Sequence, residues 1–140
     1  MSTVLHRRVN RHLQKEVNAF TRISRSRKGI SMVTFSALIK ELPFSLKDWS
    51  GYIHLSERSL QRYIKARKPL GLPYAERVYE IQQVFLLGLE VFGRKEKLDG
   101  WLYQPSIPFG GQRPVELLDT SAGSQLVTDE LHRIEYGIFA

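Results

Sequence analysis

The chain has 140 residues, enough for one domain or for two small domains that share a core, and it carries a formal net charge of +7. It contains no cysteine, which excludes a disulfide framework and thiolate metal sites and suits a cytoplasmic protein. The charge divides steeply into +7 on residues 1–28, +4 on residues 29–70 and −4 on residues 71–140, so we expect the N-terminal end to bind a polyanion and the C-terminal end not to.

The N-terminal segment predicts a short basic helix followed by a linker. Four apolar residues recur at helical spacing among arginines and lysines: Val9, Leu13, Val17 and Phe20. Residues 24–29 are only polar or basic, apart from one glycine, which is typical of a linker or of an arm that contacts phosphate. We therefore place a basic N-terminal helix and arm at residues 1–29.

Three short helices are expected in the segment after this arm. The first spans residues 31–42 and stops before a proline, which cannot continue a helix. Ser45 and Asp48 form an S-x-x-D capping pattern that opens the second helix. Ser56 caps the third helix, which ends near Ala66.

The second and third of these helices predict a helix-turn-helix. The turn is three residues long, and His54 is expected to adopt the left-handed conformation that glycine often supplies there. Leu60 and Ile64 of the third helix would face the core, so its basic residues lie on the opposite side, where they could enter a major groove. An ordinary solvated cationic face on a small helical bundle stays open as the alternative. The predicted DNA-binding residues are Ser56, Arg58, Ser59, Gln61, Arg62, Lys65, Arg67 and Lys68.

Residues 72–93 predict one long helix around which the rest of the chain is organised. Pro73 suits the first turn of this helix, and Gly93 suits its C-terminal end. Its second half is apolar almost all round, which requires cover on more than one side, but this run is far too short to span a bilayer. The helix is therefore central to the core of its own domain, a subunit interface, or both. The predicted dimer-interface residues are Val84, Leu87 and Val91.

The C-terminal part predicts short helices joined by turns. A helix is expected over residues 94–103, a turn-rich loop over residues 106–114, and a brief helix after Pro114. A last helix is capped by the segment 119–121 and ends at Tyr136. Two large apolar residues, Ile138 and Phe139, then close the chain, and they either fold back onto the domain or meet a partner.

The sequence offers no pattern typical of an enzyme, a metal site or a cofactor site. None of the four histidines lies at i, i+4 spacing from another, which is the spacing that aims two imidazoles at one metal. The Gly110-Gly111 pair has no phosphate-loop pattern around it, and no Ser–His–Asp set or close carboxylate pair is present. We therefore expect no cofactor, no metal and no enzymatic activity.

An ordered series of motifs from residue 55 to the end of the chain resembles the Xre/MbcA/ParS group of antitoxins. The motifs are LSERSLQRY (55–63), VFG (91–93) before a helix with WL (101–102), GGQRPVELLDT (110–120) and HRIEYGIFA (132–140). The resemblance implies an all-α fold in which an Xre-like helix-turn-helix bundle, residues 30–88, precedes a small toxin-binding domain, residues 89–140. The long central helix would be shared by both.

The resemblance also implies a function and its partners. Such antitoxins dimerise, block the active site of an NAD⁺-consuming RES-domain toxin with the C-terminal part, and repress their own operon by binding its operator DNA. The toxin-binding residues expected here are Trp101, Gly111, Arg113, Glu135, Tyr136, Gly137, Ile138 and Phe139. The alternative is a stand-alone dimeric helix-turn-helix regulator that has no toxin partner.

Overall fold

The computed structural model describes residues 19–137, and this part of the chain is all-α, which confirms the predicted fold class. Residues 19–28 are helical. The other helices are α2 (Met32–Glu41), α3 (Leu46–Ile53), α4 (Glu57–Ala66), α5 (Leu72–Phe92), α6 (Lys95–Leu102), the 3₁₀ helices η1 (Ile107–Phe109) and η2 (Pro114–Leu117), and α7 (Ser121–Glu135).

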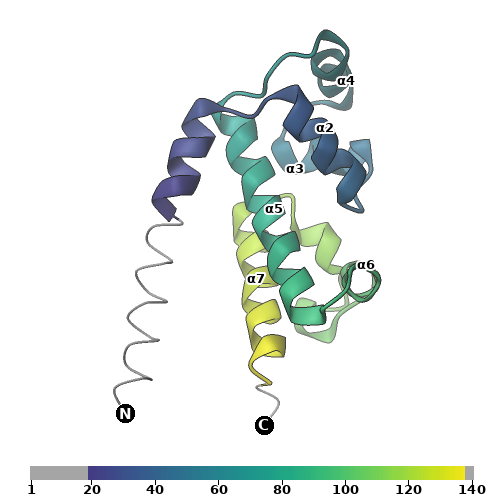
Figure 1. Ribbon diagram of the computed structural model, residues 1–140. Helices are drawn as coiled ribbons and strands as arrows, with labels where there is room; N and C mark the ends of the chain where they lie inside the picture. The colour runs from purple at the N-terminus through teal and green to yellow at the C-terminus, as the bar shows by residue number, and fades with distance from the viewer. Residues whose placement is uncertain (1–18, 138–140) are drawn as a thin grey trace, which may run out of the picture.

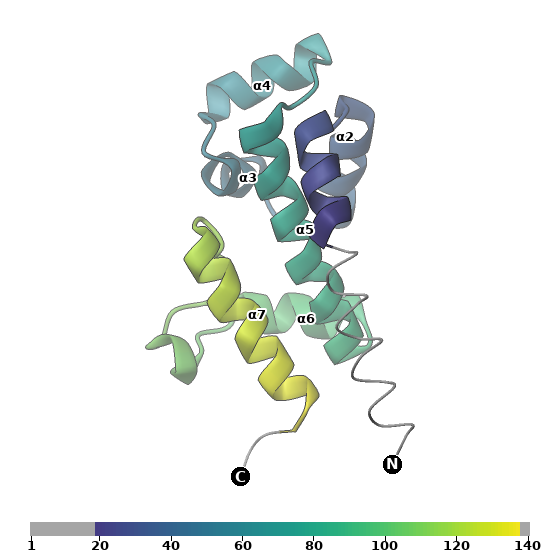
Figure 2. The same ribbon diagram turned by 90° about the vertical axis from the view of Figure 1, so that its left-hand side faces the viewer.

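Helix α5 is the axis of the molecule, as the sequence predicted. Helices α2, α3 and α4 gather at its N-terminal end, while α6 and α7 pack near its C-terminal end (Figures 1 and 2). Pro73 lies in its first turn, and Gly93, with a φ of 79°, ends it by donating its N–H to the carbonyl oxygen of Leu89 at 2.8 Å. A single helix therefore supports both halves of the chain.

The apolar second half of α5 is largely covered within the same chain. Val84 and Phe85 are each only 4% exposed. Gly88 allows α6 to approach closely, because a Cβ atom at this position would lie 2.3 Å from Cδ1 of Leu98. The helix is thus central to the core of its own chain, which was one of the two interpretations of its sequence.

Local capping interactions define the two helices of the helix-turn-helix. Ser45 and Asp48 form a capping box in which each side chain accepts a backbone N–H at 3.0 Å. The hydroxyl of Ser56 accepts the N–H of Ser59 at 3.1 Å and caps α4. His54 has a φ of 61°, so it occupies the left-handed position that was predicted for it.

Aromatic side chains fill the core of the helix-turn-helix half. Phe35 and Trp49 meet edge to face with ring centroids 5.3 Å apart, and Phe44 meets Tyr52 in the same way at 5.2 Å. All four side chains are buried. Edge-to-face pairs of this kind add about 0.5–1.5 kcal/mol each beyond the burial of their area.

The linker predicted at residues 24–29 is wrong, because residues 24–28 continue the N-terminal helix. Ser26 is buried on this helix at 6% exposure. Gly29 then turns the chain with a φ of 80°, at a point where a Cβ atom would lie 2.6 Å from the carbonyl oxygen of Leu70. Ile30 and Leu70 exchange two backbone hydrogen bonds of 2.9 Å. These long-range backbone contacts, which leave no pattern in the sequence, order the segment.

The remaining part of the predicted N-terminal helix, with Val9, Leu13 and Val17, lies outside the described residues. Its described member, Phe20, is 74% exposed. At the other end of the chain, α7 ends at Glu135 with Tyr136 as its C-cap, so the expected end is correct to one residue.

Candidate DNA-binding helix and toxin-binding domain

Helix α4 lies at the N-terminal end of α5 (Figure 2), and its basic residues are exposed to solvent. Leu60 is fully buried and Ile64 is half-buried, so these two residues hold the helix on the core. The opposite side consists of exposed residues, as the spacing predicted: Arg58, Gln61, Arg62 and Lys65. The structure therefore brings these predicted DNA-binding side chains together on one face.

The two serines of the predicted DNA-binding set have structural roles at the start of α4. The hydroxyl of Ser56 caps the helix, and Ser59 provides the N–H that it accepts. The hydroxyl of Ser59 in turn accepts a hydrogen bond of 3.2 Å from Nη2 of Arg62. The serines thus shape the helix start and orient one arginine, while Ser56 still has a hydroxyl proton to donate.

Two further cations extend the basic surface beyond the end of α4. Arg67 is the C-cap, with a left-handed φ of 54° and an exposed side chain. Lys68 places its Nζ 4.9 Å from the centre of the Tyr63 ring, a cation–π contact. The exposed arginines of α4 could donate hydrogen bonds to guanine bases, and the flanking cations could contact phosphate groups.

In the C-terminal part, Trp101, Gly111 and Arg113 already have roles within the chain. Trp101 is half-buried between Phe92 and Phe109, with ring centroids 5.6 and 6.4 Å away. Gly111 has a φ of 84°, which a side chain would disfavour. The structure therefore assigns these two predicted toxin-binding residues to packing and to a turn.

Arg113 is held by Glu116. Its guanidinium lies 3.1 Å from the Glu116 carboxylate, and its backbone N–H donates to the same carboxylate at 3.0 Å. The backbone hydrogen bond from Arg113, followed by the side-chain hydrogen bond, lowers the pKa of Glu116 below its ordinary value. A partner that uses Arg113 would have to compete with this pair.

Glu135, Tyr136 and Gly137 lie at the exposed end of α7. Tyr136 stacks on His132 with ring centroids 6.1 Å apart and remains 54% exposed. Gly137 has a φ of 62°, so the chain turns there. Ile138 and Phe139 lie outside the described residues. This end of α7 and the loop that carries Gly111 lie apart in both views, so the structure does not gather the predicted toxin-binding residues into one patch (Figures 1 and 2).

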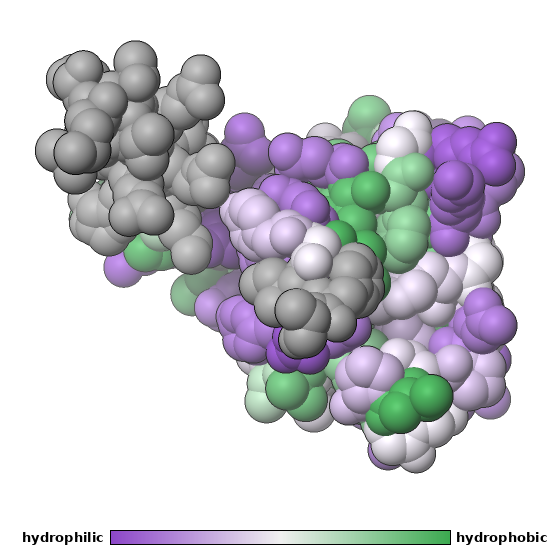
Figure 3. Space-filling view, turned by 90° about the horizontal axis from the view of Figure 1, so that it is seen from below, coloured by the Kyte–Doolittle hydropathy of each residue, from purple (hydrophilic) through white to green (hydrophobic). Residues whose placement is uncertain are grey.

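The most exposed large apolar side chain of the described residues was not predicted from the sequence. Ile107 is 94% exposed in η1, and its loop is closed by hydrogen bonds between Ser106 and Gln112 at 3.1 Å and between Ser106 and Gly111 at 2.9 Å. The pattern I-P-F-G-G predicted a turn, but it did not indicate which side chain of the turn is exposed. Seen from below, hydrophobic surface occurs as separate areas between hydrophilic ones (Figure 3).

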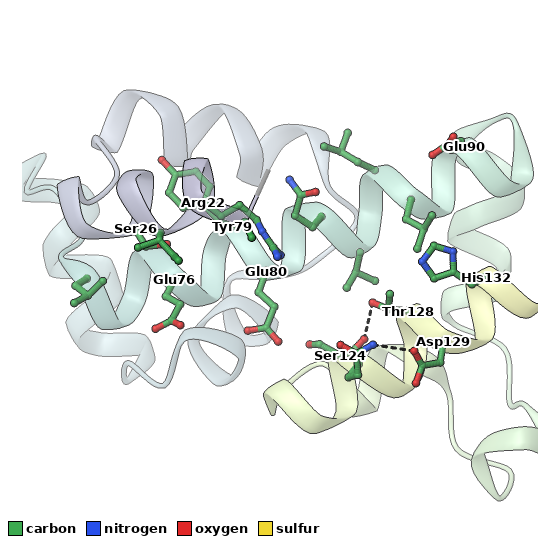
Figure 4. A pocket seen from close by; sticks show the side chains of 18 of the residues that line it. Arg22, Ser26, Glu76, Tyr79, Glu80, Glu90, Ser124, Thr128, Asp129 and His132 are labelled. Carbon is green, nitrogen blue, oxygen red and sulfur yellow. Dashed lines mark hydrogen bonds between the residues drawn. The ribbon is translucent and has the colours of Figure 1, made fainter. Parts of the chain in front are cut away.

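Two of the three predicted dimer residues, Val84 and Leu87, line a groove between the helix at residues 19–28, α5 and α7 (Figure 4). The groove has a volume of about 860 Å³, and its lining includes Leu86, Leu87 and several carboxylates. Val84 is buried within the chain, whereas Leu87 and Val91 are half-buried. Leu86, which was not predicted, is 49% exposed. Periodicity identified an apolar helix but not the side that its own chain leaves open.

Two negative findings apply to residues 19–137. No group of three or more histidine, aspartate or glutamate side chains lies close enough to hold a metal ion. No helix in this range is both long enough and apolar enough to cross a membrane.

Comparisons with known proteins agree with this arrangement. The family described as the antitoxin Xre/MbcA/ParS C-terminal toxin-binding domain matches residues 87–137. The Prs ADP-ribosylating antitoxin of Sphingobium sp. strain YBL2 is 28% identical over 130 residues, which cover 85% of this chain and 80% of that protein. The antitoxin Xre of Pseudomonas putida KT2440 is 29% identical over 80 residues, which cover 57% of this chain and 50% of that protein.

A solved structure shows the same fold. The MbcT–MbcA toxin–antitoxin complex of M. tuberculosis contains a chain that aligns with a TM-score of 0.56 and 17% identity, over 78% of this chain and 96% of that chain. Together with the family match at residues 87–137, the two curated relatives confirm the resemblance seen in the motifs. Residues 87–137 therefore match the toxin-binding domain of the Xre/MbcA/ParS antitoxins, and the comparisons as a whole support an antitoxin of this type.

Proposed function

We propose that this antitoxin neutralises an NAD⁺-consuming RES-domain toxin with its C-terminal part and represses its own operon by binding operator DNA through α4. The Sphingobium relative is named a Prs ADP-ribosylating antitoxin, and ADP-ribosylation takes its ADP-ribose from NAD⁺. One observation favours the two-sided function above all. An exposed cationic face on α4 and a match to a toxin-binding domain at residues 87–137 occur on the same α5 scaffold.

On the toxin side, the exposed end of α7 enters a pocket of the toxin. Tyr136 is 54% exposed, the chain turns at Gly137, and Ile138 and Phe139 follow in the sequence. A pocket that buries such apolar side chains gains about 1.5–3 kcal/mol for each one, less the cost of ordering the segment. Because Arg113 is already paired with Glu116, Glu135 is the better source of the charged contact.

On the DNA side, the antitoxin binds as a homodimer whose two α4 helices read two half-sites. A two-fold dimer matches a symmetric operator with half-sites about 10 or 20 bp apart. Leu86 and Leu87 in the groove beside α5 provide the apolar contact between protomers. The substitution Leu86→Glu should give a folded monomer with weak operator affinity, whereas Val84→Glu should unfold the chain because Val84 is buried. Sedimentation and circular dichroism distinguish these outcomes, and a dimeric Leu86→Glu variant would place the interface elsewhere.

Co-expression tests the toxin partner. The neighbouring open reading frame should be lethal alone, should lower cellular NAD⁺, and should be harmless together with the antitoxin. In vitro selection from random duplexes should yield a symmetric operator that the purified antitoxin binds. If the toxin and the operator DNA are both in the cytoplasm, the antitoxin is cytoplasmic as well.

The alternative function, a stand-alone regulator without a toxin partner, is disfavoured by the family match at residues 87–137. The same co-expression strain distinguishes the two functions. A stand-alone regulator would bind its operator but would leave the toxicity of every neighbouring gene unchanged.

A further inference from the structure

The segment from η2 to the start of α7 receives hydrogen bonds from the helix-turn-helix half. The hydroxyl of Tyr52, in α3, donates to the carbonyl oxygen of Val115 at 2.8 Å. Nε2 of His54 lies 2.6 Å from the carbonyl oxygen of Asp119. Because a carbonyl oxygen can only accept, Nε2 of His54 carries the proton in this contact.

Arg77 of α5 joins the same two parts from the buried side. It is 6% exposed and donates from Nε to the carbonyl oxygen of Tyr52 at 2.7 Å and from Nη2 to that of Leu118. Both carbonyls lie at helix ends, where no intrahelical partner is present. Glu80, 3.0 Å from Nη1, balances the charge. One guanidinium thus satisfies the end of α3 and the end of η2 together.

The receiving segment is tied to α7. Thr120 caps α7 by accepting the N–H of Gly123 at 2.9 Å. Gly123 packs so closely that a Cβ atom there would lie 1.8 Å from the carbonyl oxygen of Leu117. Burial raises the pKa of Tyr52, so its phenol remains protonated and able to donate. A movement of α7 would therefore displace the carbonyl oxygens that accept hydrogen bonds from Tyr52, His54 and Arg77.

His54 is the residue that connects this contact to α4. It occupies the left-handed turn position two residues before the N-cap of α4, where glycine would satisfy the backbone at lower cost. Backbone geometry alone does not explain a histidine there, but its side-chain contact with Asp119, 65 residues away in sequence, does. The ring is exposed, so water can replace this hydrogen bond at small cost.

We infer that Tyr52, His54 and Arg77 form an interdomain clamp on the segment from Val115 to Ser121, and that His54 is a positioning residue for α4. With His54 bonded to Asp119, α4 is fixed relative to α7; with the ring turned to solvent, α4 is released. A ligand that binds at α4 or at α7 and prefers one of these two arrangements therefore alters the affinity of the other surface for its own ligand. The effect is reciprocal. The identity of the two ligands rests on the proposed function, but the clamp itself does not.

The substitution His54→Gly tests the positioning role with little risk to the fold. Glycine keeps the positive φ and removes only the side-chain contact. We expect the affinity for the selected operator duplex to fall about 3- to 10-fold, the equivalent of one hydrogen bond, with unchanged helicity. Ser50→Ala is the matched control, because it removes a hydrogen bond that stays within α3 and should leave the affinity unchanged. An unchanged affinity for His54→Gly overturns the positioning role.

Hydrogen exchange tests the reciprocal effect without any toxin. In the natural chain, adding the operator duplex should slow amide exchange in residues 118–124 as well as in α4. In the double variant His54→Gly/Tyr52→Phe, the duplex should protect α4 alone. Arg77 and the hydrogen bond from Tyr103 to Pro43 remain in this variant and keep the two halves together. Equal protection of residues 118–124 in both proteins would overturn the inference.

Failure of the proposed DNA binding gives a different result from failure of the clamp. If the natural chain binds no duplex, the proposed operator function is wrong, and the clamp is then decided on the free protein. His54→Gly should accelerate exchange at the start of α4 relative to Ser50→Ala. If the two variants exchange alike there, the clamp does not position α4.

Discussion

The two predicted binding surfaces differ in how far the chain itself already uses their side chains. Within residues 19–137, Arg58, Gln61 and Lys65 of α4 form neither a salt bridge nor a side-chain hydrogen bond. In the C-terminal part, by contrast, Arg113 is paired with Glu116, and Trp101 is packed between two phenylalanines. These three side chains of the proposed DNA-binding face are thus not engaged within the chain, whereas much of the predicted toxin-binding set stabilises its own domain.

Removing the residue shared by the two halves should have the largest effect on stability. Arg77→Met leaves two carbonyl oxygens without their donor and the Glu80 carboxylate without its cation, so the free energy of unfolding should fall by about 3–5 kcal/mol. Urea denaturation measures the change. Arg133→Met is the control, because this arginine is 54% exposed and pairs only with Glu130 of its own helix, so its loss should cost less than about 1 kcal/mol. Similar losses in the two variants would mean that the buried arginine is no more important than the exposed one.

Deleting residues 137–140 separates the C-terminal surface from the fold. Neutralisation should weaken, with a loss of about 2–3 kcal/mol in toxin affinity after the cost of ordering the tail is subtracted. Melting temperature and operator affinity should stay nearly unchanged, because α7 is complete at Glu135. Calorimetric titration and cell survival measure the two sides. Full protection by the truncated chain would move the toxin contact elsewhere, and a loss of fold would make the tail part of the core.

On the other surface, Arg62→Ala should cost about 1–3 kcal/mol in operator affinity if the side chain reads a base. The loss should appear on the operator but hardly on random DNA. Arg94→Ala, outside α4, is the charge-matched control and should leave operator affinity unchanged. An equal loss on both DNA sequences would indicate phosphate contact only, and no loss even at low salt would exclude α4 from DNA binding.

The smallest effect should come from the pair in the C-terminal part. Because Arg113 lowers the pKa of Glu116 in the folded chain, this pair stabilises the fold above the unfolded pKa, and the stabilisation disappears as pH falls through the lower folded value. NMR titration should therefore give Glu116 a pKa below that of an exposed glutamate. In Arg113→Ala the pKa of Glu116 should rise only part of the way to the ordinary value, because alanine keeps the backbone N–H that is the larger cause of the shift. An unchanged pKa would exclude the guanidinium of Arg113 as a cause.

Sequence reasoning succeeded where the cause of the structure is local. Ser45, Asp48 and Ser56 act on backbone groups only three residues away, so their pattern could be read directly. It failed where the contact is distant. Neither the exchange between Ile30 and Leu70 nor the bond from His54 to Asp119 leaves a pattern, since backbone groups of any residue type can take part.

The choice of interface residues shows a second limit. Val84 and Leu86 are both apolar positions of α5, but one is buried by its own chain and the other is half open. Helical periodicity places residues on faces, and only the packed neighbours decide which face stays free. The same holds for the loop at η1, where the turn was predictable and the exposure of Ile107 was not.

The continuity of α5 bears on how such antitoxins could diversify by recombination. A crossover within this helix would join a helix-turn-helix half from one ancestor to a C-terminal half from another. In the chimera, Arg77 from one parent would then have to donate its hydrogen bond to the carbonyl oxygen of Leu118 from the other. Exposed side chains of α4 can change one at a time without touching this hydrogen bond, whereas an exchange of whole halves must preserve it.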